Sequence, residues 1–181
     1  LLSIGEVMAE IHKDQSGKFS LRFAGDTYNT AVYFARALHT AGSVAYWTLI
    51  GNDPLSKSFV DAAKCEGIDI SHSSKIADQK LGIYAVSNDA MGERSFSYWR
   101  EGSAATQMFM HDSVECELPK SKIIYLSGIT LAILRPGSRK LLIDKLRLLS
   151  ETGQSLIAFD SNYRPELWES PNAARTCLSE M

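Results

Sequence analysis

The sequence has few cysteines and almost no net charge, and each shortage excludes a class of protein. The three cysteines, Cys65, Cys116 and Cys177, are odd in number and too scattered for a zinc knuckle, which suits free thiols in a reducing compartment. The formal net charge of -2 gives no field suited to a polyanion. We therefore expect neither a disulfide framework nor a nucleic-acid partner.

Long apolar runs are also missing. The segment Leu1–Glu6 has no basic region leading into such a run, so we predict no signal peptide and no membrane span, and the cytoplasm is the expected location. The chain does not begin with Met, so we expect a few residues to precede it. An apolar content of 45% over 181 residues is ordinary for a globular protein with one sizeable core.

Several motifs that carry chemistry are absent as well. No segment matches a P-loop, a Rossmann glycine fingerprint, a zinc-binding spacing or a nucleophile elbow. The four histidines, His12, His39, His72 and His111, stand alone and are expected to be surface or satisfied side chains. The sequence therefore predicts no metal site held by its own side chains.

Strand-like and helix-like patterns alternate along the chain, which favours an α/β fold with a parallel sheet and helices on both faces. The strands of this sheet are expected at 2–7, 44–50, 122–126 and 155–159. Helices are expected at 27–38, 54–66 and 138–151, with a last one opening at Ser170-Pro171.

A second group of strands has the period-two pattern of antiparallel hairpins. These strands are expected at 9–11, 20–23, 81–87 and 94–99, with turns at 14–17 and 88–93. Antiparallel pairs inside a βαβ series predict a small sheet that stands away from the core. We interpret it as a lid, inserted at roughly 9–23 and 69–100.

The last predicted helix ends at Met181 with few strands beside it. An α/β domain of this kind would leave an apolar sheet edge uncovered. We therefore expect residues 1–181 to be the N-terminal portion of a larger domain, whose C-terminal part, or another chain, covers that edge.

The segment Phe159–Trp168 is an apolar strand end followed by dense polar groups. Open α/β sheets bind ligands at the carboxyl ends of their strands, and Arg164 is suited to hold a carboxylate or a phosphate. The alternative is that Asp160 and Asn162 only turn the chain, while Arg164 pairs with Glu166.

A second candidate precedes the first predicted helix. Gly25 permits close backbone approach, the helix N-terminus offers N–H groups, and Asn29 can bind hydroxyls as donor and acceptor. The alternative is plain capping of the helix by Asp26 or Thr27.

The lid supplies the remaining candidates. Tyr98, Trp99 and Arg100 form an aromatic pair beside an anion anchor, and Tyr84 projects either into a lid cavity or onto the core. The alternative is a core aromatic with a surface arginine paired to Glu101. Two arginines with tyrosines and an amide together predict a small, hydroxylated ligand that carries a carboxylate.

These motifs together resemble the ribokinase-like (PfkB-type) sugar kinases, and among them most closely the branch that acts on 2-keto-3-deoxygluconate. The resemblance covers the whole chain. Its pieces follow the family's order, namely Ile4-Gly5-Glu6, Phe23–Ala31, Gly51–Ser56, Glu93–Arg100, Tyr125–Ile129 and Phe159–Trp168.

The resemblance implies transfer of the ATP γ-phosphate to a primary hydroxyl of this sugar acid, with Mg²⁺ neutralising phosphate charge. Two groups of site residues follow by position. The substrate-binding group is Gly25, Asp26, Asn29, Tyr84, Tyr98, Trp99, Arg100 and Arg164, and the ATP-binding group is Asn162, Tyr163 and Arg164.

In the family the general base and most of the adenine pocket lie in a C-terminal portion that this chain lacks. We therefore expect no catalytic base among residues 1–181, and no activity from this chain alone. Two other interpretations stay open. One is a kinase for another sugar or sugar acid, and the other is a non-catalytic binding module that forms homodimers through the lid strands.

Overall fold

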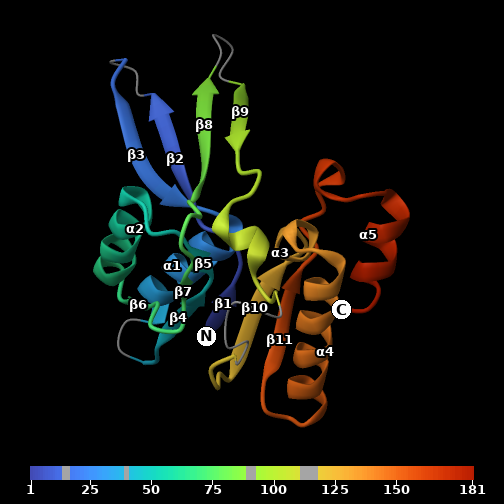
Figure 1. The fold of residues 1–181 in the computed structure, drawn as a ribbon. Helices are drawn as coiled ribbons and strands as arrows, with labels where there is room; N and C mark the ends of the chain where they lie inside the picture. The colour runs from blue at the N-terminus through green and yellow to red at the C-terminus, as the bar shows by residue number, and fades with distance from the viewer. Residues whose placement is uncertain (14–16, 39–40, 89–92, 111–117) are drawn as a thin grey trace.

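The structure is a computed structural model that describes residues 1–13, 17–38, 41–88, 93–110 and 118–181. Cys116, His39 and His111 lie outside the described residues, as do most of the two predicted hairpin turns. The described residues form a layered body and a separate small sheet that rises from it (Figure 1).

The body is built on a five-stranded sheet in the order β11-β10-β1-β4-β6, in which every neighbouring pair is parallel. Leu2 lies in register with Ile124 on one side and with Ala45 on the other. This confirms the predicted parallel α/β sheet. The strands are β1 (Leu2–Ile4), β4 (Val44–Trp47), β6 (Ile68–Asp69), β10 (Ile123–Ser127) and β11 (Leu156–Asp160).

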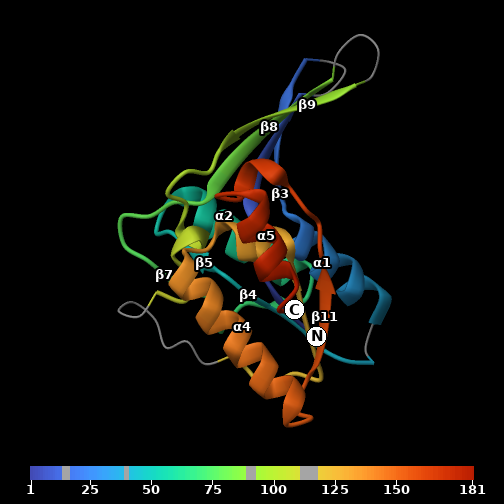
Figure 2. The ribbon, with the colours of Figure 1, turned by 90° about the vertical axis from the view of Figure 1, so that its right-hand side faces the viewer.

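Helices cover both faces of this sheet. Side chains alternate between the two faces along each strand, and β4 places apolar side chains on both. On β4, Val44 and Tyr46 pack into one core with α1 (Asp26–Leu38) and α2 (Pro54–Cys65). Trp47 instead joins the opposite core. Figures 1 and 2 show the two helix layers on either side of the sheet. The opposite layer consists of α3 (Gly128–Ile133), α4 (Pro136–Glu151) and α5 (Pro171–Leu178).

The second sheet is the predicted lid. Its order is β3-β2-β8-β9, so two antiparallel hairpins are joined by a parallel pairing of β2 with β8. It projects from the end of the body where β10 and β11 terminate (Figure 1). The strands are β2 (Met8–Lys13), β3 (Phe19–Ala24), β8 (Gly82–Asn88) and β9 (Arg94–Trp99).

The segment before Gly82 does not belong to the lid sheet, although 69–100 was expected to be inserted there. β6 lies in the body, and β7 (Ser74–Lys75) pairs with β5 (Leu49–Ile50) in a two-stranded sheet. The expected single strand at 44–50 is therefore wrong. It breaks at Thr48, whose backbone N–H donates to the Ser73 hydroxyl at 3.3 Å instead of continuing the ladder of the main sheet.

Capping residues explain where the helices start. Asp53 accepts hydrogen bonds from the N–H groups of Leu55 and Ser56, and Pro54 occupies the first turn, as predicted for α2. The short helix α3 was not predicted. Ser127 begins it by accepting a hydrogen bond from the Thr130 N–H at 3.4 Å. Two 3₁₀ turns, η1 (Ala104–Gln107) and η2 (Pro165–Leu167), were also missed.

Among the described residues, none of the helices combines the length and the apolar character that a membrane span requires.

Candidate functional site

Two segments that lie far apart in the sequence meet at the carboxyl edge of the body sheet. The Asn162 side-chain amide, just past β11, donates to Asp26 Oδ2 at 2.8 Å. Asp26 is the first residue of α1, and its other oxygen accepts the Thr27 N–H at 2.8 Å. Asp26 therefore contacts the helix N-terminus and also joins the two predicted ligand-binding segments.

The chain after β11 turns sharply and leaves charged groups exposed. Asp160 accepts the Asn162 N–H at 3.0 Å, which is a turn contact, and Asn162 has a φ of 29°. Tyr163 and Arg164 are both exposed. The ion pairs found among the described residues do not join Arg164 to Glu166. The Arg164 guanidinium is accessible for a ligand.

Two glycines keep this edge compact. A Cβ on Gly25 would lie 2.4 Å from the carbonyl oxygen of Glu6, and a Cβ on Gly128 would lie 2.0 Å from that of Ser161. Both distances are far below a normal contact. Glycine is therefore required at each position for close backbone approach, which was predicted for Gly25.

The two faces of the lid differ. On β9, Tyr98 and Trp99 are neighbours and therefore point to opposite faces. Tyr98 shares its face with Tyr84, at 5.7 Å between ring centroids, and this row continues through Glu10 to Arg22. Only one residue of the expected Tyr98–Trp99 pair can thus contact a ligand bound on either face.

Tyr84 is the most buried aromatic residue of the lid strands, at 8% exposure. Its hydroxyl donates a hydrogen bond to Glu10. Burial, followed by the neighbouring Glu10 carboxylate, raises the pKa of Tyr84 well above its usual value. Tyr84 thus stays protonated, and its hydroxyl hydrogen is donated to Glu10.

Arg100 forms an ion pair with Glu6, not with Glu101. Glu6 is only 3% exposed and also accepts a hydrogen bond from the Ser103 hydroxyl at 2.6 Å. Burial raises the pKa of Glu6, although Arg100 and Ser103 act in the opposite direction. Glu6 was not predicted as a site residue, because its partners lie 94 and 97 residues further along the chain.

A cavity of about 540 Å³ lies between lid strands β2 and β3 and the helices α1 and α2. Asn29 lines it, together with Glu10 and Arg22 from the polar lid face and Tyr28 and Tyr33 from α1. Asn29 is exposed there. The cavity thus offers an amide, a carboxylate, a guanidinium and phenols to a hydroxylated ligand.

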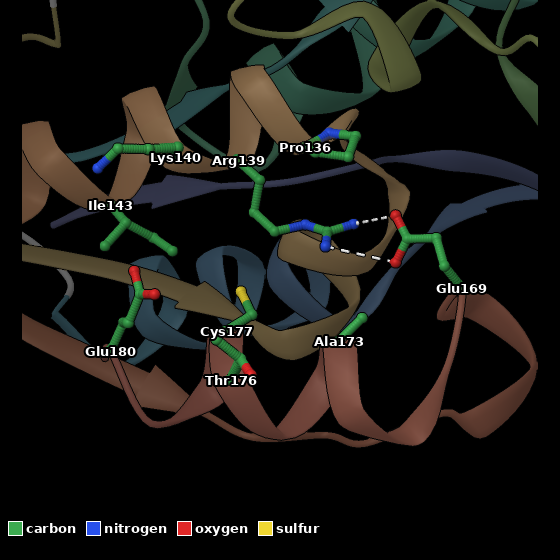
Figure 3. A pocket seen from close by; sticks show the side chains of 9 residues that line it. All are labelled: Pro136, Arg139, Lys140, Ile143, Glu169, Ala173, Thr176, Cys177 and Glu180. Carbon is green, nitrogen blue, oxygen red and sulfur yellow. Dashed lines mark hydrogen bonds and ion pairs between the residues drawn. The ribbon is translucent and has the colours of Figure 1, made fainter.

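A second cavity, of about 590 Å³, lies between α4 and α5 and involves none of the predicted residues (Figure 3). Its buried Arg139 donates to the carbonyl oxygens of Leu131 and Leu134, at 2.8 and 3.0 Å, and pairs with Glu169 at 2.9 Å. The guanidinium also lies 4.7 Å from the Trp168 ring centroid. Arg139 therefore satisfies the C-terminal end of α3 and has a structural role.

Within the described part of the chain, no group of three or more His, Cys, Asp or Glu side chains could hold a metal ion. A divalent cation at this edge of the sheet would need ligands from elsewhere, such as substrate phosphates.

A parallel sheet with helices on both faces and a projecting lid is the architecture of ribokinase-like kinases. The PfkB protein of Polaromonas sp. JS666 superimposes with a TM-score of 0.84 at 28% identity, over 99% of this chain and 61% of that one. A sugar kinase from Pyrococcus horikoshii, solved in complex with ATP, has the same fold, with a TM-score of 0.79 at 23% identity and coverage of 99% and 59%.

The chain belongs to the pfkB family of carbohydrate kinases, which it matches over residues 1–181. The 2-dehydro-3-deoxygluconokinases of Haemophilus influenzae and Escherichia coli K12 are each 37% identical to it over 182 residues. Each alignment covers 98% of this chain and 58% of the relative. The chain thus spans little more than half the length of these curated relatives.

Proposed function

We propose that the protein, in its full native reading frame, transfers the γ-phosphoryl group of ATP to the 6-hydroxyl of 2-keto-3-deoxygluconate. The observation that carries this proposal is the meeting of Asp26 and Asn162 at the carboxyl edge of the sheet, beside a lid with polar aromatic residues. The 37% identity to enzymes named for this substrate supports the choice of sugar acid.

The two arginines distinguish a sugar acid from a neutral sugar. Arg164 is exposed between β11 and η2, and Arg100 directly follows β9. A guanidinium has five N–H donors, so Arg100 can bind a ligand carboxylate while its Nη2 pairs with Glu6. A neutral sugar offers no comparable partner for either charge.

The remaining predicted residues take complementary roles in this proposal. Gly25 directly follows lid strand β3, and Asn29 lines the cavity beside it, so both are placed to bind sugar hydroxyls. Asp26 holds Asn162 in place. Tyr84 and Tyr98 wall the ligand from the lid side. Trp99 points to the other lid face, so we assign it no ligand contact.

ATP is the proposed donor, and the residues after β11 suit its phosphates. Asn162, Tyr163 and Arg164 offer an amide, a phenol and a guanidinium, of which the guanidinium is the strong phosphate partner. Mg²⁺ bound to the nucleotide would supply charge neutralisation. The contribution of this chain is to position the groups and to exclude water beneath the lid.

The chemistry also needs a base for the sugar hydroxyl proton. No motif among residues 1–181 matches such a base, and Asp160 accepts a turn hydrogen bond from the Asn162 N–H. We therefore propose that this 181-residue chain alone phosphorylates nothing. ADP release by the isolated chain, dependent on the sugar acid, would disprove that part of the proposal.

The main test measures ADP release by the protein made from its native reading frame, with 2-keto-3-deoxygluconate and with neutral sugars. We expect activity with the sugar acid, and Arg164→Ala should raise its KM at least about tenfold. Arg147→Ala removes an exposed guanidinium from α4 and is the matched control. Equal activity on a neutral sugar, unaffected by Arg164→Ala, would favour a kinase for another substrate.

We also propose that the apolar lid face binds a second copy of the chain. Leu21, Ile11, Ile83 and Trp99 share this face, and Leu21 and Trp99 are 47% and 61% exposed. Sedimentation with and without the sugar acid tests it. We expect a dimer under both conditions that Trp99→Glu dissociates, and a monomer at micromolar concentration would contradict the proposal.

A further inference from the structure

The four lid strands join the body around Glu6, and Phe23 of β3 also packs on Phe59 of α2, at 5.8 Å between ring centroids. Glu6 follows β1, and β2 begins two residues later at Met8. β3 ends at Ala24, and the next residue, Gly25, packs on the Glu6 carbonyl, as shown by the 2.4 Å distance that a Cβ would have. The first hairpin therefore enters and leaves the body beside Glu6.

The second hairpin has its root at the same residue. A Cβ on Gly82, the first residue of β8, would lie 2.9 Å from Glu6 Oε1. β9 ends at Trp99, and the next residue, Arg100, forms the ion pair with Glu6. All four lid strands thus begin or end against one carboxyl residue of the body.

The environment of this carboxylate is closed and specific. Glu6 is 3% exposed, and the side chain of Arg100 is 14% exposed. Ser103 Oγ, itself buried, donates to Glu6 Oε1 at 2.6 Å, while Arg100 donates to Oε2. Each oxygen of the carboxylate therefore has its own donor, from the segment that returns from the lid to the body.

We propose that Glu6 is a positioning residue, which fixes the lid to the body and orients the Arg100 guanidinium toward the bound sugar acid. This inference rests on the proposed function where it concerns the ligand, but the attachment of the lid can be tested without any substrate. Glu6 does not touch the substrate in this proposal and acts through Arg100.

Glu6 can orient Arg100 because the ion pair between them is largely buried. A buried guanidinium that loses its partner is strongly disfavoured, so Arg100 without Glu6 would turn toward solvent or toward other acceptors. The space beside Gly82 is filled, since a Cβ there would lie 2.9 Å from Glu6 Oε1, 3.0 Å from Met8 Cγ and 3.3 Å from Arg100 Cβ. Orientation of Arg100, and through it of the end of β9, therefore depends on the charge and length of residue 6.

The first experiment compares Glu6→Gln with wild type in the native-frame protein. The substitution keeps the size of residue 6 and its acceptor for Ser103 but removes the charge. We expect KM for the sugar acid to rise at least about tenfold, with kcat changed less than about threefold. Glu101→Gln removes the exposed neighbouring carboxylate and should leave both constants unchanged.

The second experiment asks whether Glu6 acts through Arg100. Arg100→Met removes the guanidinium, and Glu6→Gln is then added to it. If Glu6 serves to orient Arg100, the double variant should have the KM of Arg100→Met alone, within about twofold. Effects of the two substitutions that multiply independently would overturn the proposal.

The third measurement is amide hydrogen exchange of the lid strands without substrate. In Glu6→Gln we expect faster exchange in β8 and β9, by at least about tenfold, with the body strand β10 unchanged. Unchanged lid exchange would overturn the proposal even if KM rises. If wild type phosphorylates no sugar acid, the proposed function fails, and this measurement still decides whether Glu6 anchors the lid.

A milder variant covers the case in which Glu6→Gln does not fold. Ser103→Ala removes one donor to Glu6 and retains both charges. We expect the same direction of change in lid exchange, at least about threefold, with a smaller loss of stability. Exchange at the wild-type rate in a folded Ser103→Ala protein would contradict the proposal.

Discussion

Strand β1 of the body and strand β9 of the lid use their side chains in opposite ways. All three residues of β1 are buried, whereas all six residues of β9 are exposed. Yet β9 carries large aromatic residues, with Phe96, Tyr98 and Trp99 at 48%, 52% and 61% exposure. In the body, apolar side chains are buried in the core, whereas in the lid many of them face solvent.

This difference separates the residues that hold the fold from those available for binding. An exposed aromatic cluster on a narrow four-stranded sheet contributes little to folding and is typical of a binding surface. The buried rings of the body are a stability feature. Substitutions of equal chemistry in the two regions should therefore have unequal effects on the free energy of unfolding.

The largest contrast is expected for phenylalanine. Phe59 is fully buried and makes edge-to-face contacts with Tyr28 and Phe23, at 5.3 and 5.8 Å between centroids. Phe59→Ala should lower the free energy of unfolding by about 3–5 kcal/mol. Phe96→Ala, in the lid, should cost about 1 kcal/mol or less, because half of that ring is already exposed.

Urea unfolding of both variants, followed by far-UV circular dichroism, measures this contrast. If the free energy of unfolding of both variants falls with urea concentration at the wild-type slope, the same cooperative unit unfolds in each. Equal losses in the two variants would mean that the lid is part of the stabilising core, and the comparison would fail.

The sequence predicted the body better than it predicted the site. Patterns with the periods of strands and helices identified both sheets, because burial on one or two faces imposes a period on the sequence. The break at Thr48 was missed, since an apolar run looks the same whether it stays in one sheet or passes to another. The six-residue α3 is too short to have a clear period.

The site contacts depend on distances that a local pattern does not contain. Gly25 and Arg164 were proposed as site residues from their chemistry at predicted strand and helix ends, and this stays a prediction. The pairing of Arg100 with Glu6 was not predicted, because the neighbouring Glu101 is an equally good partner by sequence alone. The turn role of Asp160 was foreseen as an alternative, but the bond from Asn162 to Asp26 spans 136 residues.

A second prediction uses alkaline pH to test the body. Burial, and next the Glu66 carboxylate, raises the pKa of Tyr28 to about 12. An unfolded tyrosine has a pKa of about 10. Because the folded state holds the proton more tightly, the contribution of Tyr28 is fully present below about pH 10 and is lost as the pH rises toward 12, by up to about 3 kcal/mol.

Tyr28→Phe removes this titration. The free energy of unfolding of wild type should therefore fall more steeply between pH 10 and 12 than that of the variant, with a constant difference between pH 7 and 9. Urea midpoints at each pH measure it. Parallel curves up to pH 12 would show that Tyr28 ionises in the folded body as easily as in the unfolded chain.

The smallest expected contrast concerns a single hydroxyl in each region. Ser3, fully buried on β1, donates to the Thr27 carbonyl at 2.8 Å, which ties the strand to α1. Ser87, exposed on β8, lies 2.6 Å from the Ser95 hydroxyl across the lid. Ser3→Ala should cost about 1 kcal/mol, and Ser87→Ala only a few tenths, because water replaces the exposed bond.

The loss for Ser3→Ala should stay near this value, since a helical carbonyl such as that of Thr27 also accepts a bond from within its own helix. The urea midpoints of Ser3→Ala and Ser87→Ala, compared at equal slopes, measure the two losses of free energy of unfolding. A larger loss for Ser87→Ala would mean that the lid is held by its own cross-strand bonds. The contacts of Glu6 would then be one of several interactions that hold the lid in place.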